Sequence, residues 1–264
     1  MSTFTSSTAF KVGSTKNLAL GLLGYYRSIK EALSCIKENI SDSGSWAAEL
    51  ETDDGDGTYN YYDLVDVALT AATNVVTDAV AYVNQTTTAN EATLRTALNT
   101  DIGTFNTAFN NVLELFSDGI ITGGTPAWNT AAWGDNETNT GLLMNMTYED
   151  QLVHKHNMNV LSESFSVALT SLTINLGNVD RTSGTVLTTL NVTNYDALVA
   201  AVYSLNCKFV GANDDLEALI ANQKIHGTLM LTTPSSTYLS ATIAIQTAWA
   251  TADAAVDSII TTLS

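Results

Sequence analysis

The sequence predicts a mainly α-helical protein: a multi-helix bundle with a flexible N-terminal arm and an irregular insertion that could contain a β-hairpin. Apolar residues recur at spacings of four and three in five segments, which is the spacing of one face of a helix. The chain has 264 residues, 45% of them hydrophobic, so it is long and apolar enough to bury a large core. Only 2 prolines argue against a linker-rich or polyproline design.

The first part of the chain divides into an arm and three helices. Residues 1–14 are mostly Ser, Thr and small apolar residues, which predicts an extended arm. Residues 15–118 follow as the first part of the bundle. The first predicted helix ends near residues 41–44, and the third ends at Asp118-Gly119. The apolar faces of the three helices are, in order, Leu22, Tyr26, Ile29, Leu33, Ile36, Ile40; Val65, Leu69, Ala72, Val76, Ala79, Val83; and Leu94, Leu98, Ile102, Phe105, Phe109, Val112, Phe116.

The second part of the chain begins with a Thr/Asn/Gly-rich segment, residues 119–193. Periodicity there is weak, although a helix through Phe165, Ala168 and Leu172 and a hairpin around residues 180–184 are compatible with it. Residues 194–264 form the second part of the predicted bundle, with a helix from Asn194, broken at Gly211, and a last helix after Pro234. Their apolar faces are Leu198, Val202, Leu205, Phe209, Leu216, Leu219 and Ile245, Trp249, Ala252, Val256, Ile259, Leu263.

Charge is distributed unevenly along the chain, whose formal net charge is −17. Residues 1–37 hold five basic residues and one acidic residue, a balance of +4, and the other 227 residues balance at −21. An acidic partner for the basic segment is available in this protein itself, in the same or a neighbouring subunit. A solvated helix face or contact with anionic lipid are the alternatives. Nucleic acid is not expected as a partner, because phosphate contacts need more Lys and Arg.

Residues 52–63, Thr-Asp-Asp-Gly-Asp-Gly-Thr-Tyr-Asn-Tyr-Tyr-Asp, lie directly before the second predicted helix. The segment resembles the twelve-residue EF-hand loop, especially its dockerin variant, which binds calcium through oxygen ligands and turns at a glycine in position 6. The resemblance implies a calcium site with these ligands: Thr52, Asp54, Asp56, Thr58 through its carbonyl, Asn60 and Asp63. Thr52 departs from the usual Asp at position 1, and dockerins carry two copies where this chain has one. An Asp/Gly-rich turn that caps the helix is the alternative.

Other chemistry is sparse in the sequence. The P-loop, G-x-G-x-x-G, G-x-S-x-G and H-E-x-x-H motifs are absent, which argues against common enzyme classes. His154 and His156 would share one face of a strand near Glu149 and Asp150, where they could bind a transition metal, although surface histidines are the simpler interpretation. Cys35 and Cys207 could form one disulfide or stay as two packed thiols. Neither a Sec signal peptide nor a transmembrane segment is expected.

These observations predict a non-enzymatic structural subunit that self-assembles into a virion, phage tail or extracellular filament. Its expected partners are copies of itself and other structural proteins, and its expected location is a virion or the extracellular space. The alternative is a calcium-dependent carbohydrate-binding or adhesive surface protein, with calcium at residues 52–63 and Trp128 and Trp133 stacking on surface glycans. An enzyme of unrecognised type is the third interpretation.

Overall fold

The computed structural model describes residues 7–47, 60–85, 88–116, 146–177, 192–226 and 236–260. Within these ranges the chain forms six α-helices and two short 3₁₀ turns, Gly44–Trp46 and Thr88–Asn90, and contains no β-strand. The predicted mainly α-helical class is therefore confirmed. The helices are α1 (Ser7–Asn39), α2 (Tyr61–Asn84), α3 (Glu91–Phe116), α6 (Tyr148–Gly177), α8 (Val192–His226) and α9 (Ser236–Ile260).

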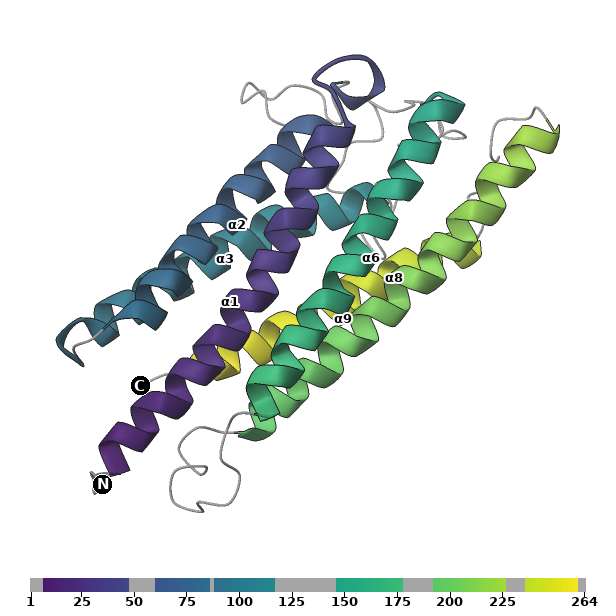
Figure 1. Cartoon of the computed structure of the whole chain (residues 1–264). Coiled ribbons are helices and arrows are strands. Elements are labelled where there is room, and N and C mark those ends of the chain that lie inside the picture. The colour runs from purple at the N-terminus through teal and green to yellow at the C-terminus, as the bar shows by residue number, and fades with distance from the viewer. Residues whose placement is uncertain are drawn as a thin grey trace.

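The six helices form a closed ring in the order α1, α2, α3, α9, α8, α6 and back to α1 (Figure 1). Polar contacts show the antiparallel direction for two of the neighbouring pairs, α1 with α2 and α6 with α8. Lys37 near the end of α1 forms an ion pair with Asp66 near the start of α2. Lys155 near the start of α6 lies 2.8 Å from Glu217 near the end of α8. A ring of this kind encloses one shared core, so the two predicted halves of the bundle are parts of a single unit.

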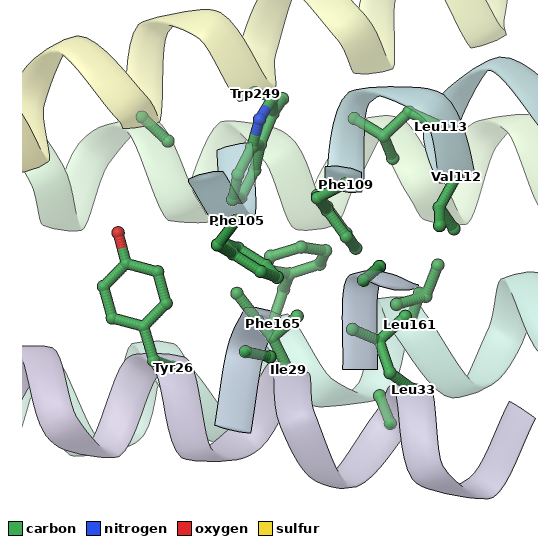
Figure 2. Packing of buried hydrophobic residues seen from close by; sticks show 14 of the residues in the cluster. Tyr26, Ile29, Leu33, Phe105, Phe109, Val112, Leu113, Leu161, Phe165 and Trp249 are labelled. Atoms are coloured by element: carbon green, nitrogen blue, oxygen red, sulfur yellow. The ribbon is translucent and has the colours of Figure 1, made fainter. Parts of the chain in front are cut away.

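Large aromatic side chains fill the middle of the ring (Figure 2). The rings of Phe109 on α3 and Trp249 on α9 have centroids 4.6 Å apart, and Phe165 on α6 lies 5.4 Å from Phe209 on α8. Tyr26 on α1 meets Phe105 on α3 edge to face at 5.6 Å. Edge-to-face and offset contacts of this kind stabilise a core beyond the area that they bury.

Helix α2 faces this core largely through small side chains. Its buried residues include four alanines, whose lack of bulk lets α2 approach α1 and α3 closely: Ala68, Ala71, Ala72 and Ala79. The helix is long and apolar enough to cross a membrane by length and hydropathy, with 39% of its apolar window buried. A core helix of a bundle passes the same test. The expected absence of a transmembrane segment therefore stays a prediction.

Two predicted boundaries and the break at Gly211 are wrong, whereas the helix through Phe165, Ala168 and Leu172 is confirmed. Helix α1 begins at Ser7, so residues 7–14 are not extended, because lengthening a formed helix adds one hydrogen bond for each residue fixed. Residues 148–177, inside the predicted insertion, form α6, whose Phe165 and Leu172 are fully buried. Helix α8 continues through Gly211, because glycine costs a helix only about 1 kcal/mol and the flanking turns pack on the core. The hairpin predicted around residues 180–184 lies outside the described residues.

Two helical glycines give a matched test of the packing. A Cβ atom at Gly24 of α1 would come within 2.9 Å of the Ser171 Cβ on α6, whereas one at Gly211 would meet nothing within 4 Å. We expect Gly24→Ala to lower the free energy of unfolding by about 1–3 kcal/mol through overpacking. Gly211→Ala should raise it by about 0.5–1 kcal/mol. Urea unfolding measures both, and equal midpoints would contradict the close approach of α1 and α6.

Candidate functional site

The predicted calcium ligands lie only partly within the described residues. Thr52, Asp54, Asp56 and Thr58 lie outside them. Asn60 is the N-cap of α2, and its side-chain oxygen accepts a hydrogen bond from the Asp63 backbone N–H at 2.7 Å. The Asn60 amide donates in return to the Asp63 carboxylate at 2.6 Å. Because Asn60 caps the helix, α2 begins at Tyr61, inside the segment expected to precede it. Asn60 and Asp63 have the capping role that was the alternative to calcium.

A hydrogen-bonded network of polar side chains, buried except for the exposed Asn39, lies next to this helix start. Asn39 at the end of α1 donates to the Asn157 side-chain oxygen at 3.1 Å, and the Asn157 amide lies 3.5 Å from the Tyr61 hydroxyl. The Tyr61 hydroxyl lies 3.1 Å from His154 Nδ1. The four residues come from α1, α2 and α6, so these hydrogen bonds join three helices at one end of the bundle. Buried polar groups stabilise a fold only when they are paired. Asn157, Tyr61 and His154 Nδ1 are paired in this way, whereas His154 Nε2 has no hydrogen-bond partner among the described residues.

The imidazole of His154 is fully buried between aromatic rings. Phe116 stacks on it with centroids 4.9 Å apart, and Tyr61, itself covered by Trp46, meets its edge. Burial lowers the pKa of His154 from 6.5 to about 3, because the charged imidazolium would lose its hydration. The same loss of hydration raises the pKa of the Tyr61 hydroxyl. Both groups are therefore neutral at pH 7, and this site is a structural network of uncharged hydrogen bonds.

The interpretation of His154 and His156 as surface histidines holds for His156 and is wrong for His154, and the alternative metal-binding pair on a strand is also wrong. Residues 154–156 lie in helix α6 and not in a strand, so the two side chains point about 200° apart around the helix axis. His154 is buried and His156 is exposed. Among the described residues, no group of three or more His, Cys, Asp or Glu side chains is placed to hold a metal ion.

The two cysteines are both free thiols. Cys35 on α1 is half-buried, and Cys207 on α8 is exposed, so the prediction that both are packed is wrong for Cys207. Helix α6 lies between α1 and α8 in the ring, which keeps the two thiols apart within one molecule. The apolar face predicted for α8 turns Leu205 and Phe209 inward and so leaves Cys207, between them, on the outer surface.

A groove of about 490 Å³ runs between α1 and α6. We call this the α1/α6 groove. Its volume is in the range of small-molecule and side-chain binding clefts. Its apolar lining comes from Ala32, Val160 and Val167, while charged groups are contributed by Arg27, Glu31 and Glu163. The remaining lining residues are Gly24, Ser28, Cys35, Ser164 and Ser171.

The serines of the groove contribute little polarity to it. Ser28 donates to the carbonyl of Gly24 at 3.0 Å, and Ser164 donates to the carbonyl of Leu161 at 2.7 Å. Since both hydroxyls bond their own helix, they are not free to donate to a ligand. The groove therefore offers apolar surface with charged groups beside it, which suits the side chains of another protein surface better than a strongly polar small molecule.

Apolar side chains are also exposed on the outer surface of α8. Tyr203 and Val210 are 59% and 49% exposed, and Cys207 lies between them on the same face. We call these three residues the α8 stripe. The four-and-three pattern predicted only the buried face of this helix, so the stripe was not predicted from the sequence. The signal was present, because Tyr203 and Val210 are apolar positions that do not belong to the four-and-three pattern of the buried face.

By its fold the described part of the chain is an antiparallel bundle of six helices with one aromatic core. No protein-family model, no curated protein and no solved structure matches it. Trp128 and Trp133, the residues expected to stack on glycans, lie outside the described residues.

Acid should destabilise the fold through His154. Its folded pKa of about 3 lies below the value of 6.5 expected in the unfolded chain, so only the unfolded state binds a proton between these values. Stability should therefore fall as pH drops below 6.5, by up to about 1.4 kcal/mol per pH unit from this residue. His154→Gln should remove that part of the slope in denaturant titrations, and His156→Gln should not. Parallel profiles for the original chain and His154→Gln would rule out this role.

Calcium binding at residues 52–63 can be tested by melting temperature. If calcium binds, it should stabilise the folded chain by mass action, so a double variant Asp54→Asn, Asp56→Asn should melt at a lower temperature in calcium buffer and at the original temperature in chelator. Asp42→Asn, an exposed acidic position after α1, is the matched control. Equal melting of the double variant and the original chain in calcium would remove the metal site.

Proposed function

We propose that the chain is a structural subunit that assembles with copies of itself into a virion, a phage tail or an extracellular filament. The supporting observation is the presence of two apolar surfaces on one bundle. The α8 stripe exposes Tyr203 and Val210, and the α1/α6 groove is lined by Val160 and by Val167, which is 60% exposed. Contiguous exposed apolar surface is a feature of protein interaction sites, because its burial on contact releases water.

The rigidity of the bundle supports the same role. The helices surround one aromatic core, and the polar chain from Asn39 to His154 joins three of them at one end. A subunit of a repetitive assembly must present its contact surfaces in a fixed relation to one another, because small angular errors accumulate from copy to copy. A bundle in which every helix packs on two neighbours meets this requirement.

Charge supports assembly as well. Part of the basic N-terminal segment is neutralised within the chain, because Lys37 of α1 pairs with Asp66 and Lys30 lies 3.3 Å from Glu31. Arg27, by contrast, is exposed on α1 and makes no ion pair with any other residue that the structure describes. It is available to an acidic group on a neighbouring copy, as the uneven charge of the sequence suggests. Calcium-dependent glycan binding stays the alternative and depends on residues 52–63.

Self-assembly predicts a mass well above 28.1 kDa in light scattering of the purified chain, increasing with protein concentration. The double variant Tyr203→Ser, Val210→Ser should shift the assembly to concentrations at least 10-fold higher, because two exposed apolar anchors are lost. Val67→Ser, at a 47% exposed position on α2, is the matched control and should leave assembly unchanged. A mass of one chain at every concentration, with and without calcium, together with no particles in electron micrographs, would exclude this function.

A further inference from the structure

We infer that the α8 stripe of one copy docks in the α1/α6 groove of a second copy, in a head-to-tail contact. This inference rests on the proposed self-assembly and names the two surfaces that meet. The stripe lies on α8 and the groove lies between α1 and α6, so each copy can present both surfaces at the same time. A contact between two different surfaces is heterologous, and it continues as a ring or as an open filament.

Shape and polarity are the first argument. Tyr203, Cys207 and Val210 follow each other at four and three residues, so they form one ridge about 10 Å long on α8. The groove between two antiparallel helices has the form that accepts such a ridge. Its lining includes Ala32 and Val160, and the hydroxyls of Ser28 and Ser164 bond their own helices, so an apolar side chain docked there leaves these two hydroxyls paired.

Charge fixes one direction and register for the docked helix. Arg27 lies eight residues before Cys35 on α1, and Asp214 lies seven residues after Cys207 on α8. If α8 of the second copy runs antiparallel to α1 with Cys207 opposite Cys35, then Asp214 lies beside Arg27, since both separations span about two helical turns. Val210 then lies opposite Ala32 in the groove, and Tyr203 packs just beyond the end of the groove that Cys35 marks. Asp214 is exposed and forms no ion pair with other described residues. The same register brings Lys208 towards Glu31 and Glu163, within reach of its long side chain.

The cysteines make the contact measurable. Cys35 lines the groove, and Cys207 lies in the middle of the stripe. Within one chain α6 separates their helices, and a disulfide needs Cα atoms within about 7 Å of each other. A Cys35–Cys207 disulfide would therefore join two copies. Two thiols lose two electrons and two protons to form it, and copper(II) phenanthroline with oxygen is the oxidant that accepts them.

To test this contact, the purified full chain is oxidised with copper(II) phenanthroline in the presence of oxygen, and the products are separated on a non-reducing gel. We expect a ladder of dimers, trimers and larger species from the original chain, because every copy carries both thiols. Cys35→Ser alone and Cys207→Ser alone should give monomers. A mixture of the two variants should give dimers and nothing larger, and a reductant should reverse them.

The register has its own test in the same mixture. Arg27→Glu in the chain that keeps Cys35, or Asp214→Arg in the chain that keeps Cys207, should lower the dimer yield about 2- to 5-fold, as expected for an ion pair at the rim of a contact. Combining both reversals should restore the yield. Asp257→Arg, at an exposed position on α9, is the matched control and should leave the yield unchanged.

Other outcomes separate this inference from the proposed function. A dimer from Cys35→Ser alone means that two stripes meet each other, which overturns the docking. Assembly in light scattering without dimers in the mixture also overturns the docking and leaves self-assembly in place. A single-chain mass in light scattering overturns both.

Discussion

The rings of Tyr25, Phe109, Phe165 and Trp249 meet inside the bundle, and the rest of the structure depends on that contact. In the ring of helices α1 lies opposite α9, and α3 lies opposite α6. Tyr25 and Trp249 stack across the first diagonal at 6.5 Å, and Phe109 and Phe165 meet across the second at 6.5 Å. Helices that are not neighbours are thereby held together, which closes the ring around a filled interior.

The polar chain at one end complements this apolar centre. Hydrophobic burial has no direction, whereas hydrogen bonds from Asn39 through Asn157 and Tyr61 to His154 are satisfied in only one relative placement of α1, α2 and α6. The bonds among Asn157, Tyr61 and His154 Nδ1 offset part of the cost of burying these groups, while His154 Nε2 has no partner among the described residues. The network therefore adds specificity to a core whose strength comes from aromatic area.

The outer surface follows from the same geometry. A helix of a closed ring turns one face inward, and α8 buries Leu198, Leu205 and Phe209 in the core. Its Tyr203 and Val210 cannot share that face, so they remain exposed. The close approach of α1 and α6 at Gly24 and Ser171 lies at one end of the groove that these helices form. The proposed contact surfaces are thus consequences of how the core is packed.

Much of the fold could be predicted from the sequence. The apolar spacing of three and four predicted where α1, α3 and α9 lie and which face each buries. This was possible because a buried helix face needs an apolar residue in each consecutive turn, which is a local pattern in the sequence. Leu33, Phe105, Phe109 and Val256 are buried as that spacing predicts. The capping role of Asn60 and Asp63 was also readable, since both partners lie within one helical turn.

Only the tertiary structure decided what depends on distant residues meeting. Helix α6 looked irregular because its face mixes Phe165 with the buried polar residues Gln151, His154 and Asn157, whose partners come mainly from other helices. The ring order, the groove and the exposure of Cys207 depend on which helices become neighbours. Periodicity along one segment does not determine which helices become neighbours, because helix pairing depends on the fit of side-chain volumes and hydrogen bonds between segments.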